Sequence, residues 1–238
     1  MLFRSVVQET HWRGSWQFSK SGWHVVSSGT HKEQGAGVLI MVHGSLCKAK
    51  DIRFNEIMPG RLLHVRIPGE SFSLDIISFY QFVWRSKQTL TQNQEQRKDA
   101  LAKLSQTIAQ LPQRNTLLVA GDFNTSLNPD KKHVGPCTIG LSRLGQRGTK
   151  DLQSLLERHK LIAANTWSVR KPATHVQGNS VSQIDFALLR QSQARGPGKS
   201  CSPCRKFPVA IWREGSRHYP LLGEIGRASC RERVCQYV

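Results

Sequence analysis

Acidic residues are scarce in this chain. Its 238 residues contain 16 Asp and Glu against 34 Lys and Arg, which leaves a formal net charge of +18. A surplus of this size predicts a polyanionic partner, most simply a nucleic acid, and argues against a small-molecule substrate. A basic surface without a specific partner is the alternative interpretation, and the charge alone does not distinguish DNA from RNA.

Long apolar runs are also absent. No stretch approaches the roughly 18 apolar residues that a membrane span requires, and the longest, residues 37–42, predicts a buried strand. The N-terminal sequence Met-Leu-Phe-Arg does not have the layout of a signal peptide. We therefore expect an intracellular protein that is not secreted and has no membrane partner. Nothing in the sequence indicates a small-molecule cofactor.

Cysteine is not used as a structural framework. The chain has six cysteines at irregular spacing, which favours a reducing compartment over a set of disulfides. Cys201 and Cys204 form a CxxC pair in a basic loop, and Cys230 and Cys235 follow. Because no second CxxC pair lies at a zinc-ribbon distance, a zinc site is the less favoured interpretation.

The hydrophobic pattern predicts strands in runs that are interrupted by single helices. Leu101, Leu104, Ile108 and Leu111 share one helical face, and Thr149 is a plausible N-cap for a second helix. This order predicts two sheets packed face to face with helices outside. The expected strands are 3–7, 23–26, 36–42, 62–67, 72–80, 117–120, 161–164, 184–189, 207–212 and 219–225, and the first helix is 92–111.

The end of the chain differs from the rest. Residues 224–238 are rich in Arg, carry two Cys and have no apolar period. They are more typical of a vector or assembly read-through than of the end of a domain. We therefore expect one domain over residues 1–223 and a tail over residues 224–238 that is disordered or non-native.

An acid and an amide follow the buried strand at 117–120. Gly121 ends the apolar run, and Asp122 and Asn124 lie two residues apart, so that on an extended chain their side chains point to the same side. A carboxylate there can take a proton from water, and an amide can donate to a phosphate oxygen. Gly-Asp also ends many strands as a plain turn.

Two further polar groups lie at strand ends, and a third lies inside a strand. Glu9 follows the first strand, and His218 precedes the last strand. Asp185 lies inside an apolar strand, where an unpaired charge is costly, and His218 is its natural partner. Taken singly, Glu9 has the simpler interpretation of a solvated strand end, and His218 that of a surface or core histidine.

The ordered motifs Gln-Glu-Thr (8–10), Gly-Asp-Phe-Asn (121–124), Ser-Gln-Ile-Asp (182–185) and Ser-Arg-His (216–218) resemble those of the endonuclease/exonuclease/phosphatase superfamily. Its members include abasic-site endonucleases, pancreatic-type deoxyribonuclease and the endonuclease domains of non-LTR retrotransposons. Residues 80–84, 165–167 and 173–174 resemble the retrotransposon branch in particular. The resemblance covers residues 3–223 and implies an α/β fold, a two-sheet, four-layer α/β sandwich of the DNase/abasic-endonuclease type.

The resemblance also implies roles for individual residues. Glu9 would hold a divalent metal, Mg²⁺ or Mn²⁺, which prefer oxygen ligands. Tyr80 would donate to the scissile phosphate. Asp122 would orient or deprotonate the attacking water, while Asn124 would hold a phosphate oxygen.

Asp185 would pair with His218 and favour the charged imidazole, which would stabilise the transition state. Thr174, Ser182 and Arg217 are the remaining candidate substrate contacts. As core alternatives, Tyr80 could be a packed aromatic with a satisfied hydroxyl and Thr174 a structural hydroxyl.

The expected function is that of a nuclear, metal-dependent endonuclease that nicks DNA for a non-LTR retrotransposon. Two departures from the family pattern bear on activity: Arg217 stands where the family has Asp, and the chain starts almost at Gln-Glu, without the strand that carries an Asn metal ligand. Another phosphoesterase or DNase of the superfamily is one alternative. A truncated, inactive relic that binds nucleic acid is the other.

Overall fold

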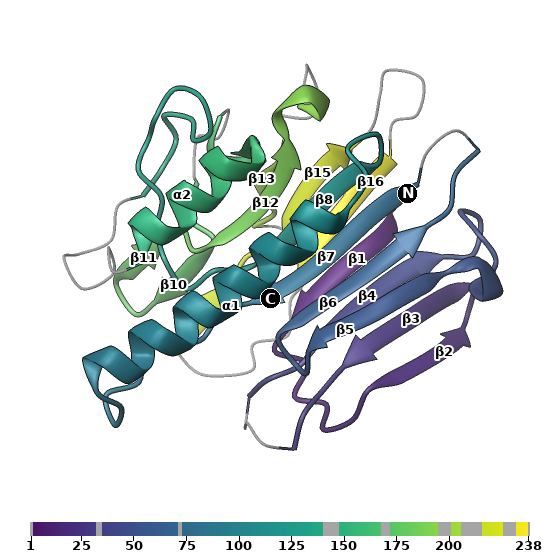
Figure 1. The fold of residues 1–238 in the computed structure, drawn as a ribbon, viewed down its shortest axis with the longest axis horizontal. Coiled ribbons are helices and arrows are strands. Elements are labelled where there is room, and N and C mark those ends of the chain that lie inside the picture. The colour runs from purple at the N-terminus through teal and green to yellow at the C-terminus, as the bar shows by residue number, and fades with distance from the viewer. Residues whose placement is uncertain are drawn as a thin grey trace.

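The structure is a computed structural model that describes residues 2–31, 35–70, 73–139, 148–167, 172–194, 201–205, 216–225 and 232–237. Two large sheets pack face to face, and both described α-helices lie against one of them (Figure 1). This is the two-sheet α/β sandwich that the sequence predicted. Among the described residues, no helix has the length and apolar character needed to cross a membrane.

The first sheet places two of the predicted strand-end groups side by side. Strands β7 and β8 are parallel neighbours, and the helix α1 forms the crossover between them, so that both strands end at the same edge. The strand order is β5 (Arg53–Met58), β6 (Leu62–Ile67), β7 (Leu74–Tyr80), β8 (Thr116–Asp122), β12 (Asp185–Arg190) and β9 (Leu161–Ala163).

The two α-helices form an outer layer on this sheet. Helix α1 (Leu90–Gln110) begins with a capping box between Thr89 and Gln92 and buries Leu104 and Ile108. Helix α2 (Thr149–His159) buries its leucines in the same cluster, together with apolar residues of β7, β8 and β12. The apolar period that predicted the first helix is therefore confirmed as its core-facing side. The N-cap predicted at Thr149 is wrong, because Gly148 takes that position and Thr149 is the first residue of α2.

The second sheet holds the N-terminal strands and part of the tail. Its order is β13 (Ser202–Pro203), β15 (Leu221–Ile225), β16 (Glu232–Tyr237), β1 (Leu2–Gln8), β4 (Val38–His43), β3 (Trp23–Ser28) and β2 (Trp16–Lys20). A third, smaller sheet contains β11 (Ser180–Ser182), β10 (His175–Gln177) and β14 (Ser216–His218). Short 3-10 turns lie at Ala49–Asp51, Ala164–Thr166 and Gln191–Gln193.

Strand β16 lies within the tail, which we expected to be disordered or non-native. It lies between β1, to which it is parallel, and β15, to which it is antiparallel (Figure 1). Without it, β1 and β15 would each present an edge of unpaired N–H and C=O groups in the middle of the sheet. Backbone pairing therefore draws a segment without apolar period into a strand.

Other differences concern short or exposed elements. Strands β2 and β5, which are exposed along most of their length, were not predicted from the sequence. The β10–β11 hairpin turns at Gly178, which has a φ of 55°. The strand predicted over 207–212 lies outside the described residues.

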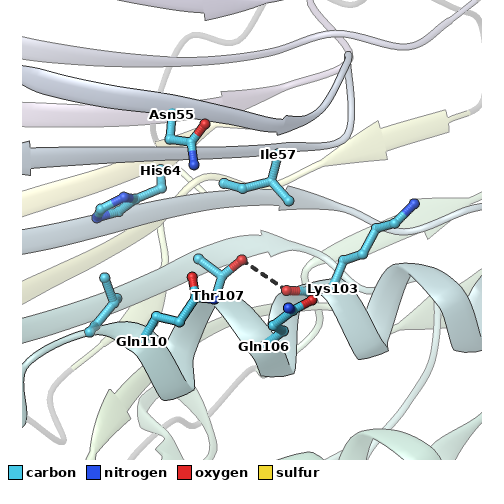
Figure 2. Close-up of a pocket in the computed structure, with 8 residues that line it drawn as sticks. Asn55, Ile57, His64, Lys103, Gln106, Thr107 and Gln110 are labelled. Atoms are coloured by element: carbon cyan, nitrogen blue, oxygen red, sulfur yellow. Dashed lines mark hydrogen bonds between the residues drawn. The ribbon is translucent and has the colours of Figure 1, made fainter.

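A pocket of about 230 Å³ opens between β5, β6 and the C-terminal half of α1. Figure 2 shows Asn55, His64, Lys103, Gln106 and Thr107 around it, with the Thr107 hydroxyl donating to the Lys103 carbonyl at 2.8 Å. None of its lining residues is a predicted site residue. The candidate chemistry is therefore located elsewhere, at the ends of the strands.

Candidate active site

Strands of both large sheets and of the small sheet bring the predicted residues to one edge of the sandwich. Asp122 lies opposite Tyr80 on β7 and opposite Asp185 on β12. Glu9 directly follows β1, and His218 ends β14. Groups that are far apart in sequence therefore converge because their strands end together.

Asp122 is buried, with 1% of its surface exposed. Its Oδ1 accepts the backbone N–H of Asn124 at 2.7 Å, and Asn124 adopts a φ of 47°. Asn tolerates this left-handed conformation better than most residues. The Asn124 Nδ2 donates to the Gln81 carbonyl at 2.9 Å, which leaves the second amide N–H for another acceptor. The predicted turn therefore also fixes the orientation of the Asp122 and Asn124 side chains.

Asp185 and His218 form the predicted pair. The His218 Nδ1 lies 3.3 and 3.2 Å from the two carboxylate oxygens of Asp185, which is fully buried. Burial acts against the charged imidazole, but the charge and hydrogen bond of Asp185 outweigh it and raise the pKa of His218 to about 9. His218 is therefore a cation at neutral pH.

The environment of Asp122 raises the pKa of its carboxyl group. Burial is the largest cause, and the negative charge of Asp185 adds to it, while His218 and the Asn124 N–H favour the ionised form. The net effect raises the pKa of Asp122 well above its usual range. A carboxylate with a raised pKa is a stronger base when it is ionised.

Glu9 and Tyr80 contact each other. The Tyr80 hydroxyl donates to Oε1 of Glu9, and the Arg61 guanidinium lies over the Tyr80 ring, 4.3 Å from its centroid. Burial, followed by the charges of Glu9 and Asp122, raises the pKa of Tyr80 far above its usual range. Tyr80 therefore keeps its proton and remains a hydrogen-bond donor.

The donor set fits a hard divalent cation. One ligand atom from each of Asp122, Asp185 and His218 lies within 4.8 Å of the others. Two buried carboxylates face each other across neighbouring strands, with Glu9 close enough to raise the pKa of Asp122 further. Such a concentration of negative charge is costly unless a cation compensates it, and Mg²⁺ takes oxygen ligands of this kind. Because Asp185 already binds His218 and Asp122 is the candidate base, Glu9 remains the carboxylate expected to hold a metal.

Thr174 holds the backbone at Asp185 in place. Its Oγ1 accepts the backbone N–H groups of Ile184 and Asp185, both at 3.1 Å, and its side chain is fully buried. Asn165 adds a second support, because its Nδ2 donates to the Asp185 carbonyl at 3.0 Å. Thr174 therefore fixes the strand that carries the acid and is not exposed for the direct substrate contact that was expected.

The other two expected substrate contacts lie on the small sheet. The Ser182 hydroxyl is within 3.1 Å of Nδ1 of His175. Arg217 pairs with Val176 across β10 and β14, and its side chain lies outside the described residues. Arg217 is thus one position from His218 on the same strand, and its role as a contact stays a prediction.

Two residues of the site escaped the sequence analysis. His175 lies opposite His218 in register, with ring centroids 4.4 Å apart, and burial and the His218 charge lower the pKa of His175. A Gly-Asn turn signal at 178–179 would have revealed the hairpin that carries it. Arg97 on α1 donates to the carbonyls of Phe82, Phe123 and Asn124, and no local motif marks it.

The fold is shared with solved structures of other proteins, including a 3′ phosphatase and an AP endonuclease. It matches the 3′ phosphatase NExo from Neisseria, solved with a product DNA hairpin, with a TM-score of 0.62 and 17% identity over 94% of this chain and 89% of NExo. It matches the catalytic domain of APE2 from Xenopus laevis with a TM-score of 0.59 and 12% identity, over 99% and 85%. For the AP endonuclease LMAP from Leishmania major the values are 0.54 and 14%, over 84% and 69%.

At these identities the likeness establishes the fold. No protein-family model and no curated protein sequence matches this chain. The abasic-endonuclease type of α/β sandwich, which the ordered motifs implied, is therefore confirmed by the structure.

Proposed function

We propose that this chain is a metal-dependent phosphodiester hydrolase that nicks one strand of DNA. The observation that carries the proposal is the convergence of Asp122 with the Asp185–His218 pair at one sheet edge. A general base and a buried cation within one site are what hydrolysis of a phosphodiester requires.

In the proposed reaction a water molecule attacks the phosphorus atom. Asp122 takes the proton of this water as the new P–O bond forms, and its raised pKa makes it an effective acceptor. The bond from phosphorus to the leaving sugar oxygen then breaks, and this oxygen takes a proton from a second water molecule. The products are one strand end with a phosphate and one with a hydroxyl.

Negative charge grows on the phosphate oxygens in the transition state. His218, charged at neutral pH, and the free amide N–H of Asn124 would stabilise it. The Tyr80 hydroxyl would exchange its bond to Glu9 for one to the phosphate. Once bound, Mg²⁺ or Mn²⁺, held by Glu9, would neutralise further phosphate charge.

DNA is the proposed partner because of the charge of +18, which gives affinity for the phosphate backbone. The retrotransposon role, in which the nick primes reverse transcription, and the nuclear location that goes with it rest on the motif resemblance. An enzyme acting on another phosphoester would use the same residues.

A binder without activity is the second candidate. Arg217 in place of the family's Asp supports it, because it reverses a charge next to His218. Such a protein would bind nucleic acid in a salt-sensitive way through its basic surface, with no turnover.

A nicking assay on supercoiled plasmid tests the proposal. We expect conversion to open circle with Mg²⁺, none with EDTA, and none for Asp122→Ala, whereas the exposed acid variant Asp51→Ala keeps wild-type activity. Plasmid binding by a folded wild-type chain without nicking in Mg²⁺ or Mn²⁺ would refute the hydrolase and favour the binder.

A further inference from the structure

Three large aromatic side chains stand exposed at one corner of the seven-stranded sheet. Trp12, Trp16 and Phe18 have 39%, 61% and 40% of their surface exposed. Trp16 and Phe18 lie on the same face of the edge strand β2, and the ring centroids of Trp12 and Phe18 are 6.2 Å apart. Grouped exposure of this kind marks an interaction surface.

Contacts with other segments hold the loop that carries Trp12 in place. Its Ser15 hydroxyl donates to Oε1 of Glu56 at 2.5 Å and accepts the Gly29 N–H at 3.3 Å. A Cβ on Gly29 would lie 2.2 Å from the Trp12 carbonyl oxygen, so the two backbones are in direct contact. The backbone that carries the indole is therefore already ordered, so that less conformational entropy is lost when a ligand binds.

The same loop begins at the candidate site. Trp12 follows Glu9 by three residues, so its Cα lies within about 11 Å of that of Glu9. Three nucleotides of one DNA strand rise by about 10 Å. A strand whose phosphate lies near Glu9 can therefore reach the aromatic side chains within a few nucleotides.

The surroundings favour a nucleic acid over an apolar protein surface. Arg13, between Trp12 and β2, and Lys20, at the end of β2, are both exposed. Bases offer flat π faces to aromatic rings, and the phosphates between them attract the neighbouring cations. The nearby acid Glu56 is already engaged by Ser15.

We infer that Trp12 and Phe18 form a stacking surface for an unpaired base a few nucleotides from the phosphate that is cut. This inference rests on the proposed function for its partner, DNA, and names the form of substrate. Because base faces in a duplex are covered by their neighbours, the surface selects DNA with a single-stranded or frayed segment beside the cut.

Binding without turnover tests this surface. Fluorescence anisotropy in EDTA would compare a short oligothymidine with a strand of equal length made only of abasic nucleotides, which keeps the phosphates and removes the base faces. We expect Trp12→Ala and Phe18→Ala each to weaken oligothymidine binding about tenfold and to leave abasic-strand binding unchanged. The matched control is Phe54→Ala, since Phe54 is 46% exposed on the other sheet.

Equal losses for both strands, or losses no larger than that of Phe54→Ala, would overturn the stacking surface, provided that the melting temperatures match. The outcomes of this test and of the nicking assay are separable. A chain that binds oligothymidine through Trp12 but never nicks plasmid would retain the stacking surface and refute the hydrolase.

Discussion

Nδ1 of His218 lies 3.2 Å from Oδ2 of Asp185, although the two residues are 33 positions apart in sequence. The imidazole ends a strand of the small sheet, and the carboxylate begins β12 of the six-stranded sheet. This contact therefore ties the two sheets together and sets the charge of the site.

Asp185→Asn should lower the pKa of His218 from about 9 towards the ordinary value of about 6.5. The charged imidazole would then be lost near neutral pH, and nicking at pH 8 should fall by about a hundredfold. NMR titration of the imidazole and a pH–rate profile measure the two effects. A His218 pKa that stays near 9 in the variant would contradict the assigned cause.

The Asp185–His218 pair also makes the free energy of unfolding depend on pH. Because the folded pKa of His218 is raised, its stabilising effect is complete below about pH 6.5 and is lost as the pH rises through about 9. Denaturant unfolding across this range should therefore show a decline in the free energy of unfolding that is smaller in Asp185→Asn. The same decline in both proteins would contradict the linkage.

Asp122→Asn should abolish activity and increase stability. The folded pKa of Asp122 is raised, so the folded chain binds more protons than the unfolded chain above pH 4, and stability falls as the pH rises towards 8. Asn keeps the acceptor for the Asn124 N–H and removes the buried charge.

Without metal at pH 8, we expect Asp122→Asn to raise the free energy of unfolding by about 1 kcal/mol and to abolish nicking. Urea unfolding in EDTA measures the first effect, with Asp51→Asn as the exposed control. A destabilised Asp122→Asn would show that this charge is compensated within the protein.

The site residues that could be predicted from the sequence are those marked by a local pattern. Asp122, Asn124 and Asp185 stand at the ends of apolar strands, where period and motif coincide, and the structure places all three together. Arg97 was missed because its role is to hold backbone carbonyls of distant segments, which leaves no local pattern. The place of β16 was missed because two open edges, not its own sequence, recruit it.

Arg97→Met should lower both stability and turnover. The buried guanidinium donates to the carbonyls of Phe82, Phe123 and Asn124, which hold the two loops beside Tyr80 and Asp122. Leaving these carbonyls without donors should cost about 3 kcal/mol.

Thermal melts and nicking rates per folded molecule separate the two effects of Arg97→Met. We expect kcat to fall while the affinity for DNA changes little, since Arg97 lies beneath the loops. Lys98→Met, on the exposed face of the same helix, should leave both unchanged. A lowered melting temperature with wild-type kcat would restrict Arg97 to a purely structural role.

Ending the chain at Ile225 should destabilise it, because β16 separates β1, which leads to Glu9, from β15, which follows His218. Its loss would expose two strand edges within the sheet and let the two halves of the site separate. We expect a lower melting temperature, aggregation and no nicking.

Cys235→Pro gives the sharper comparison for β16, because proline removes a ladder N–H from the middle of the strand, while Cys235→Ser keeps it. Position 235 pairs with Ser5 on one side and Leu222 on the other. If Cys235→Pro and the chain ending at 225 both melt like the wild type and Cys235→Ser, the tail is dispensable and β1 and β15 hold together without it.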